Sequence, residues 1–393
     1  MKNFVNYINT INKDPFLKPK AKFNTAILMP ELDTTEGIYR SLLPSYVLNG
    51  IDDLRIIVMG IREKVGLSPN EPDFDFDEKL VNEVDHIVFP FVSYPLQNII
   101  ETIRDFATRN FKKEMYFSYY IDANFYAMAD SYPHAREYKL AKMIDNIEEN
   151  IKAVDQVIVT NKTFKTYLIE KLKERHPNET FKTNITFQPL FILPDLMKVE
   201  FKTSKDRSKK KILLIGDEYQ FSDINFIKGI LKDTKVQYAV STEIHIIGFN
   251  GVREKKNFLS GLNFEYHERV SYFKYFELIA HIAPDVLLIP ANKNSFNRTS
   301  KNYIKYIEFA YLNVPVIAPN IDPYSNLIST NQNGFLCDDK GDYFFQIGAM
   351  FTTPEKFEAS IGPAYALAAS EYNIVADNNI KNLRLIYFPH AER

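Results

Sequence analysis

The segment that decides the fold spans residues 284–339 and reads PDVLLIPANKNSFNRTSKNYIKYIEFAYLNVPVIAPNIDPYSNLISTNQNGFLCDD. Its apolar run at residues 285–290 predicts a buried strand, and a polar loop at residues 292–299 follows. A helix is predicted to begin near Ser300, with Asn313 in the left-handed position past its end and a second strand directly after. Strand, helix and strand in this order form one βαβ unit of a parallel sheet.

The predicted helix places a carboxylate on its apolar face. Lys301 lies in the first turn, and Lys305 and Glu308 follow at four and seven residues, so the three share one face. Glu308 also falls within the apolar stripe that runs from Ile304 to Tyr311. A carboxylate facing inward is costly unless it is hydrogen-bonded. Glu308 is therefore either a ligand-binding group or a stripe-edge glutamate paired with Lys305 or Lys301, and Lys301 is either a phosphate ligand or a surface lysine.

The length of 393 residues is too great for one ordinary hydrophobic core and predicts two domains. Apolar runs alternate with helical patterns on both sides of the basic, polar stretch at residues 202–211, which we interpret as a linker. We expect a helix at residues 37–48 in the first half, and one from residue 222 with Ser222 as its N-cap in the second. The fold class is therefore α/β with two doubly wound, Rossmann-like domains, divided between about Val199 and Lys211.

Composition excludes several classes of function. Lys and Arg number 48 against 50 acidic residues, and this balance provides no field to attract nucleic acid. Cys337 is the single cysteine, so the sequence predicts no disulfide and no cysteine-based metal cluster, which fits a cytoplasmic protein. No run approaches the roughly 20 apolar residues of a membrane span. We expect no transmembrane segment, which leaves peripheral membrane contact open.

Other motifs in the sequence do not support a metal, hydrolase or NTPase site. The acidic run at residues 73–77 has alternate carboxylates, but Glu78 and Val84 stand where an EF-hand needs glycine and glutamate. We therefore predict an acidic loop rather than a calcium site or the manganese site of a GT-A enzyme. The seven histidines show no paired metal-binding spacing, and the sequence has neither GxSxG nor GxxxxGK[ST]. No metal site is expected.

The stretch FNRTSKNYIKYIEFAYLNVPVIAPNIDPY resembles the donor-binding segment of bacterial GT-B glycosyltransferases of the group 1, or retaining, type. It is similar to a branch with FN, then KS, an IK and LEY helix, a VPV strand and a closing PY. The NG turn at Asn333 and Gly334, and the strand after it, also resemble that family. The matching positions are Asn297, Lys301, Lys305, Glu308, Pro315 and Tyr324.

The resemblance implies a metal-independent hexosyltransferase without a cofactor. Its two Rossmann-like domains would face a cleft, with an acceptor-side domain at residues 1–200 and a nucleotide-sugar domain at residues 201–370. A C-terminal helix at residues 371–393 would pack back toward the first domain. The donor would be a nucleotide-diphosphate sugar and the acceptor a glycan, a lipid-linked group or a protein.

The resemblance also implies roles for residues of the second domain. Glu308 would bind the ribose hydroxyls and Lys301 the diphosphate, with Asn297, Ser300 and Lys305 beside them. Ser300 stands where the larger retaining family has a glutamate facing the sugar. Gly216 and Asp217 would approach the donor phosphates after the first strand of this domain.

In the first domain, Gly37 resembles the family's glycine-rich turn, and a plain helix start explains it equally well. Asp122 follows the strand at residues 115–121 and is either a catalytic or acceptor-orienting group or a structural cap. Two rival functions remain open. They are a catalytically inert GT-B subunit that binds a partner or glycan, which Ser300 favours, and a nucleotide-sugar epimerase.

Overall fold

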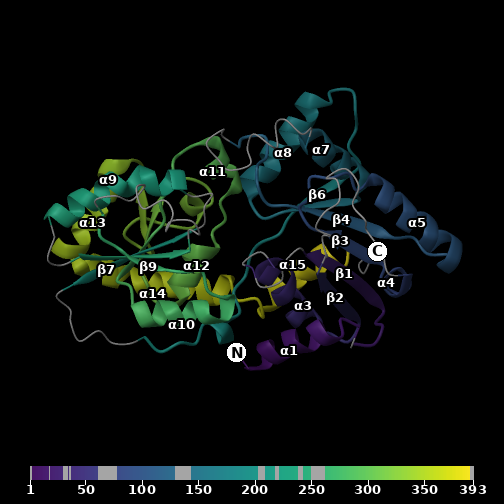
Figure 1. The fold of residues 1–393 in the computed structure, drawn as a ribbon, viewed down its shortest axis with the longest axis horizontal. Coiled ribbons are helices and arrows are strands. Elements are labelled where there is room, and N and C mark those ends of the chain that lie inside the picture. Colours follow the sequence, from purple (N-terminus) through teal and green to yellow (C-terminus); the bar gives the residue numbers. More distant parts are fainter. Residues whose placement is uncertain are drawn as a thin grey trace. The chain divides into compact units, whose positions relative to one another are not determined.

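The computed structural model describes residues 2–16, 18–29, 34, 37–60, 78–128, 143–201, 209–216, 221–237, 242–248 and 262–389. They form two compact units (Figure 1). Unit 1 holds the described residues up to Leu193 and from Ile374 onward, and unit 2 runs from Pro194 to Asn373. Asp217 and the acidic run at residues 73–77 lie outside the described residues.

Unit 1 is built on a parallel sheet whose six described strands have the order β2-β1-β3-β4-β5-β6. The chain runs from β1 to β2 on one side and then returns to pair β3 with the other side of β1. This reversal is the doubly wound arrangement that the alternating pattern predicts. The strands are β1 (Phe23–Met29), β2 (Leu54–Gly60), β3 (His86–Phe89), β4 (Tyr116–Ile121), β5 (Gln156–Val159) and β6 (Asn184–Phe187).

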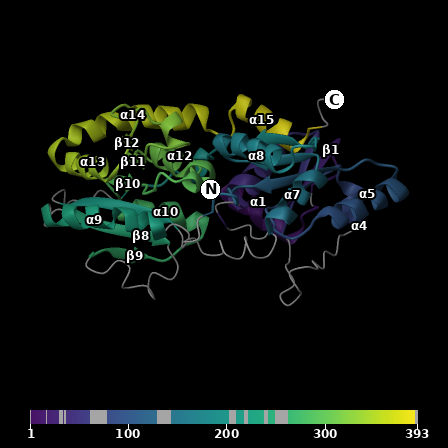
Figure 2. The same cartoon turned by 90° about the horizontal axis from the view of Figure 1, so that it is seen from above.

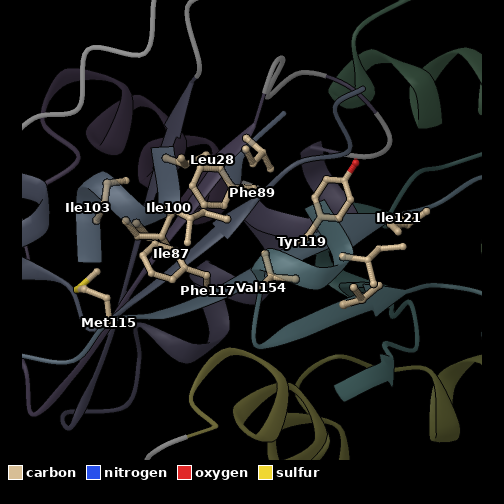
Figure 3. Packing of buried hydrophobic residues seen from close by; sticks show 14 of the residues in the cluster. Leu28, Ile87, Phe89, Ile100, Ile103, Met115, Phe117, Tyr119, Ile121 and Val154 are labelled. Atoms are coloured by element: carbon tan, nitrogen blue, oxygen red, sulfur yellow. The ribbon is translucent and has the colours of Figure 1, made fainter. Parts of the chain in front are cut away.

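Helices cover both faces of this sheet. One face carries a continuous apolar core, in which Phe89 and Phe117 of neighbouring strands stack and Ile100 and Ile103 of α5 pack over the sheet (Figure 3). Burial of such side chains is the main driving force for folding. The helices of unit 1 are α1 (Lys2–Lys13), η1 (Ile38–Leu42), α3 (Leu43–Leu48), α4 (Glu78–Glu83), α5 (Gln97–Phe111), α7 (Met143–Ala153), α8 (Lys162–Arg175) and α15 (Asp377–Tyr387).

The end of α15 is tied into unit 1 by Tyr387. Its carbonyl oxygen accepts hydrogen bonds from Thr25 Oγ1 at 2.5 Å and lies 2.9 Å from His86 Nδ1. Its hydroxyl lies 2.6 Å from the Tyr120 hydroxyl and 3.1 Å from Gln188 Oε1. Because all these groups are buried, the contacts fix the helix end against strands β1, β3 and β4.

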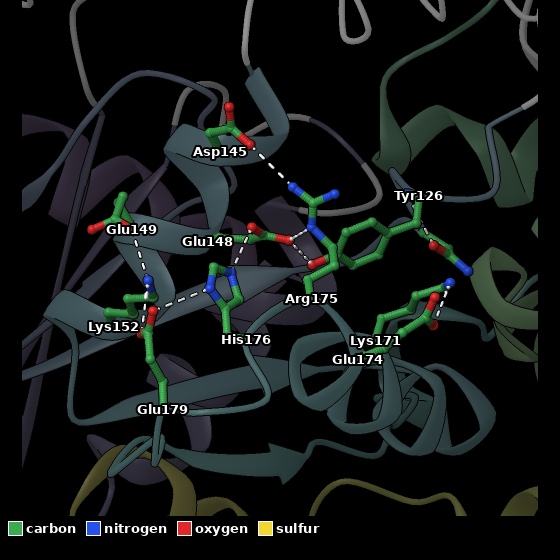
Figure 4. A network of polar contacts seen from close by, with 11 residues as sticks. Tyr126, Asp145, Glu148, Glu149, Lys152, Lys171, Glu174, Arg175, His176 and Glu179 are labelled. Atoms are coloured by element: carbon green, nitrogen blue, oxygen red, sulfur yellow. Dashed lines mark hydrogen bonds and ion pairs between the residues drawn. The ribbon is translucent and has the colours of Figure 1, made fainter.

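A second polar network joins α7 to α8 around the buried carboxylate of Glu148 (Figure 4). Arg175 Nε and the Tyr126 hydroxyl each donate to Glu148 Oε1 at 2.6 Å, and His176 Nε2 lies 2.9 Å from Oε2. Burial acts to raise the pKa of Glu148, but the hydrogen bonds from Tyr126, His176 and Arg175 outweigh it and lower the pKa below its usual range. The network stabilises unit 1, because each carboxylate oxygen of Glu148 is hydrogen-bonded to side chains of this unit.

Unit 2 repeats the doubly wound plan with six described strands in the order β12-β11-β10-β7-β8-β9. The strand order reverses between β7 and β10, which pair directly, with Ile212 opposite Val286. All described pairs are parallel, as the βαβ pattern predicts. The strands are β7 (Lys210–Gly216), β8 (Thr242–Gly248), β9 (Glu265–His267), β10 (Val286–Leu288), β11 (Val316–Pro319) and β12 (Phe335–Cys337).

The start of β7 and the start of α9 differ from expectation. The predicted linker ends early, because β7 begins at Lys210 and takes in Lys211. Helix α9 begins at Phe221, so Ser222 is inside the helix and is not its N-cap. The helices are η2 (Pro194–Leu196), α9 (Phe221–Gln237), α10 (Tyr272–Ile282), α11 (Ser295–Ser300), α12 (Ile304–Tyr311), η4 (Tyr324–Asn326), α13 (Lys340–Thr352) and α14 (Pro354–Glu371).

The predicted helix end at Asn313 is confirmed. Asn313 has a φ of 60°, in the left-handed region. Its N–H donates to Ala310 O at 3.2 Å, and the N–H of Val314 donates to Phe309 O at 2.9 Å. These two bonds form a Schellman motif, in which asparagine replaces the more frequent glycine. Strand β11 starts two residues after Val314.

Candidate functional site

The site of interest lies at the C-terminal edge of the unit 2 sheet, where the strand order reverses between β7 and β10. Open α/β sheets bind ligands at this kind of edge, because the loops there diverge to opposite faces. Helix α9 follows β7, and the segment that contains α11 follows β10. Residues from these two segments contact a carboxylate that was not predicted from the sequence as part of the site.

That carboxylate belongs to Asp223, in the first turn of α9, and it is almost completely buried. Asp223 Oδ1 accepts hydrogen bonds from the Asn292 N–H at 3.0 Å and from Asn297 Nδ2 at 2.9 Å. Asp223 Oδ2 lies 3.1 Å from Lys301 Nζ. Asp223 thus links α9 to the segment after β10, and its buried charge is compensated by one cation and two N–H donors.

Lys301 does not lie at the start of the helix that carries Glu308, where the sequence predicts it. The expected polar loop at residues 292–299 instead contains helix α11, which ends at Ser300, and the helix expected from Ser300 begins only at Ile304, as α12. Lys301 is the C-cap of α11, with an extended backbone at ψ 144°. The expectation that Lys301 occupies the first turn of the helix that carries Glu308 is therefore wrong, and so is the shared helix face with Lys305 and Glu308.

Tertiary contacts accompany this break, together with a local one, in which Asn302 Oδ1 accepts the Ile304 N–H at 3.1 Å. Asn297 is buried and bound to Asp223, and Lys301 turns toward the same carboxylate. The Tyr324 hydroxyl donates to the carbonyl of Asn302 at 3.1 Å, within the segment between the two helices. Helix α11 itself starts at the expected polar loop, where Asn294 Oδ1 accepts the N–H of Asn297 at 2.7 Å as an N-cap.

Glu308 is fully buried in α12, as its place in the apolar stripe predicts. Its Oε2 accepts from Lys305 Nζ at 2.9 Å and lies 3.4 Å from the hydroxyl of Tyr275 on α10. Lys305 Nζ also lies over the Tyr275 ring, 4.3 Å from its centroid. Burial and the nearby Glu308 carboxylate raise the pKa of Tyr275 well above its usual range, so its hydroxyl remains a donor. The pairing with Lys305 is one of the two roles that the sequence left open for Glu308.

Two glycines stand together at the same sheet edge. Gly216 ends β7 and is opposite Gly248, which ends β8. Gly248 has a φ of 84°, and a Cβ built there would overlap the carbonyl oxygen of Gly216. The absence of a side chain on Gly248 therefore lets the ends of β7 and β8 approach each other closely.

In unit 1, Asp122 follows β4 at the C-terminal edge of its own sheet and forms an ion pair with Arg40. Arg40 belongs to η1, a π-helical turn that follows Gly37 after β1. The carbonyl of Gly37 accepts from the Ser41 hydroxyl, and its φ of −56° is one that any residue adopts. The π-helical form was not predicted, and such turns occur frequently at functional sites.

Four residues near these sites were not predicted from the sequence: Asp223, Tyr275, Arg40 and Gly248. Two of them carried a usable signal. Asp223 lies in the first helical turn after the first strand of its domain, and Gly248 directly follows the apolar run that forms β8. Tyr275 and Arg40 are joined to Glu308 and Asp122 only by tertiary contacts, which sequence spacing does not reveal.

Comparisons with known proteins agree on the architecture. No family model matches the sequence, and no curated protein sequence matches it either. Among solved structures, sucrose-phosphate synthase from Thermosynechococcus elongatus has a TM-score of 0.65 at 11% identity, covering 94% of this chain and 99% of that one. The chain has the GT-B fold.

Other GT-B structures match over a similar length. HepE from Anabaena, solved in complex with UDP-glucose, has a TM-score of 0.59 at 12% identity and covers 92% of this chain and 99% of its own. A glycosyltransferase from Rickettsia africae has a TM-score of 0.57 at 14% identity, with 93% and 98% covered. The GT-B fold was predicted from the alternating pattern and the donor-segment resemblance. No helix in the described part of the chain has both the length and the apolar character needed to cross a bilayer.

Proposed function

We propose that this GT-B chain is a glycosyltransferase that moves a sugar from a nucleotide-diphosphate donor to a glycan, lipid-linked or protein acceptor. The observation that carries the proposal is the position of the Lys301 ammonium at the edge where the unit 2 sheet reverses its strand order. A cation at the edge where a ligand can approach the strand ends suits a diphosphate. Solved structures of similar fold that contain UDP-glucose or UDP support the same class of donor.

In this proposal Lys301 contacts the diphosphate, and Asp223 acts through it as a positioning residue. The side chain of Lys301 is 14% exposed, whereas Asp223 is 1% exposed, so the ammonium faces outward from its buried partner. Asn297 holds the other oxygen of Asp223. Gly216 provides the approach for the phosphates, Asp217 follows it, and Ser300 next to Lys301 faces the sugar.

Glu308 is proposed to accept hydrogen bonds from the ribose hydroxyls. Its carboxylate is enclosed before donor binding, and the partner that covers Oε2, Lys305, is 26% exposed. Movement of Lys305 toward the donor would free that oxygen for the ribose and bring a second cation near the nucleotide. The competing role for Glu308 is a structural carboxylate that joins α12 to Tyr275 of α10.

Metal-independent hexosyl transfer is part of the proposal. In this proposal Lys301 and Lys305 would contact the diphosphate in place of a carboxylate-bound ion. In unit 1 we propose that Asp122 orients the acceptor as a hydrogen-bond acceptor, because its pairing with Arg40 holds it at the sheet edge near Gly37.

The test is incubation of the protein with UDP-, GDP-, dTDP- and ADP-sugars, with and without an added glycan acceptor, so that the sugar passes to the glycan or to water. Release of the nucleoside diphosphate is followed by mass spectrometry, and binding of each donor by calorimetry. Release of the diphosphate with one donor, with and without EDTA, is the expected result. Binding without release would favour the inert subunit that Ser300 suggests, and interconversion of the free donor without an acceptor would favour an epimerase. Absence of binding to every donor would contradict all three.

A further inference from the structure

Two histidines and a glutamate converge on the sheet of unit 2, at a place that the proposed donor site does not use. His245 lies in the middle of β8, while Glu265 and His267 belong to β9, the last described strand on that side of the sheet (Figure 2). The parallel register sets His245 opposite Glu265. Because side chains alternate along a strand, His267 projects from the same face as Glu265.

The donor atoms of these three residues lie at distances typical of a coordination sphere. His245 Nδ1 is 3.1 Å from His267 Nε2. The carboxylate oxygens of Glu265 are 3.6 Å from His245 Nδ1 and 3.7 Å from His267 Nε2. Zinc bonds of about 2.0–2.2 Å in a tetrahedral arrangement place neighbouring ligand atoms roughly 3.3–3.6 Å apart. One ion therefore fits between the three side chains with small adjustments.

A second observation concerns the other ring nitrogen of His245. The side chain is nearly completely buried, and its Nε2 has no hydrogen-bond partner within the part of the chain that the structure describes. That nitrogen lies 3.7 Å from Glu243 Oε2. A metal-bound histidine commonly presents its second nitrogen to a carboxylate, which fixes the tautomer that binds the ion. Glu243, two residues earlier on β8, is in position for this role.

We propose that His245, Glu265 and His267 bind one divalent transition metal ion, with zinc as the best match to two imidazole nitrogens and one carboxylate. The side chain of Glu265 is 65% exposed, so solvent can reach the ion and complete its coordination. The ion would join β9 to β8 and stabilise unit 2. It lies within the strands rather than at the sheet edge of Gly216 and Gly248, so the proposal does not rest on the proposed function.

A hydrogen bond between His245 and His267 alone would explain their short distance without a metal. It does not explain the approach of an exposed carboxylate to both nitrogens, because a solvated glutamate gains little from neutral imidazoles. Sequence spacing did not reveal the group, since His245 and Glu265 belong to different strands.

The experiment uses the full chain without an affinity tag, dialysed against a chelator and then titrated with zinc in competition with a chromophoric chelator. We expect one equivalent bound with a Kd in the micromolar range or tighter, and a melting temperature that rises with zinc but not with magnesium. Co²⁺ should give the visible absorption of a tetrahedral site.

The variants Glu265→Gln and His267→Gln should each weaken zinc binding by at least about tenfold and abolish the Co²⁺ spectrum. Both positions are at the sheet margin, where these substitutions preserve size and polarity. The control is Glu358→Gln, at an exposed glutamate on α14, which should bind zinc as the unmodified protein does. Absence of saturable binding at one equivalent, or equal affinity in His267→Gln, would overturn the proposal.

Discussion

Lys301 Nζ lies 3.1 Å from Asp223 Oδ2, and this ion pair connects α9 to the segment after β10 where the unit 2 sheet reverses its strand order. Asp223 is buried, whereas Lys301 can reach solvent. Removal of one partner therefore has unequal consequences, because a buried carboxylate without its cation is more costly than an ammonium that can move outward.

Lys301→Met should lower the free energy of unfolding by about 3 kcal/mol, since it leaves Asp223 buried and uncompensated. Asp223→Asn should cost less, about 1 kcal/mol, because Lys301 can become hydrated. The double variant should recover part of the loss, with a coupling of about 1–3 kcal/mol in urea unfolding. Additive effects of the two substitutions would show that the pair contributes nothing as a unit.

Gly248→Ala should prevent correct folding of unit 2 or destabilise it severely. The added methyl group overlaps the Gly216 carbonyl, and the φ of 84° is strained for alanine. Gly229→Ala is the matched control, because Gly229 is in α9 with no atom within 4 Å of an added Cβ. That control should raise the melting temperature slightly, since alanine is favoured over glycine in a helix by about 0.8–1.0 kcal/mol. Similar melting temperatures for both variants would contradict the close approach of β7 and β8.

Glu308→Gln separates the two roles of this residue. If Glu308 binds the ribose, the variant should bind the nucleotide about ten- to a hundredfold more weakly, because it loses a hydrogen bond to a charged group. Its melting temperature in the absence of nucleotide should change little. Calorimetric titration and thermal unfolding of the same preparation distinguish the ribose-binding role from the structural role. Unchanged affinity with lowered stability would make Glu308 a structural carboxylate that holds Lys305 and Tyr275.

Asp122→Asn should lower turnover more than donor affinity, because Asp122 belongs to unit 1 and the donor residues to unit 2. The matched variant is Arg40→Gln, which removes the partner that holds Asp122 at the sheet edge. It should reduce turnover through the same carboxylate. Steady-state rates at saturating donor measure both effects. Full activity of Asp122→Asn would leave this residue as a structural partner of Arg40.

The sequence predicted those parts of the fold that depend on local pattern. The βαβ segment and its helix end at Asn313 follow from apolar periodicity and from the tolerance of asparagine for the left-handed conformation. The burial of Glu308 followed from its place among Ile304, Ile307 and Tyr311.

The features that were missed depend on contacts between distant residues. No proline or glycine marks the break between Ser300 and Ile304, and the contacts of Asp223 with Asn297 and Lys301 accompany it. Strand β9 is only three residues long and polar, so it has no alternating pattern to read. Such tertiary effects override local propensity.

Calorimetric titration tests whether Lys301 contacts the diphosphate of a nucleotide donor. Each of UDP, GDP, dTDP and ADP, with its nucleoside, is titrated into the unmodified protein and into the charge-balanced variant Asp223→Asn/Lys301→Met, after circular dichroism shows that both are folded. We predict that the unmodified protein binds one nucleoside diphosphate saturably and that the variant binds it about ten- to a hundredfold more weakly. The affinity for the nucleoside should be the same in both proteins. Equal diphosphate affinity in the two proteins, or no binding to the unmodified protein, would contradict the account.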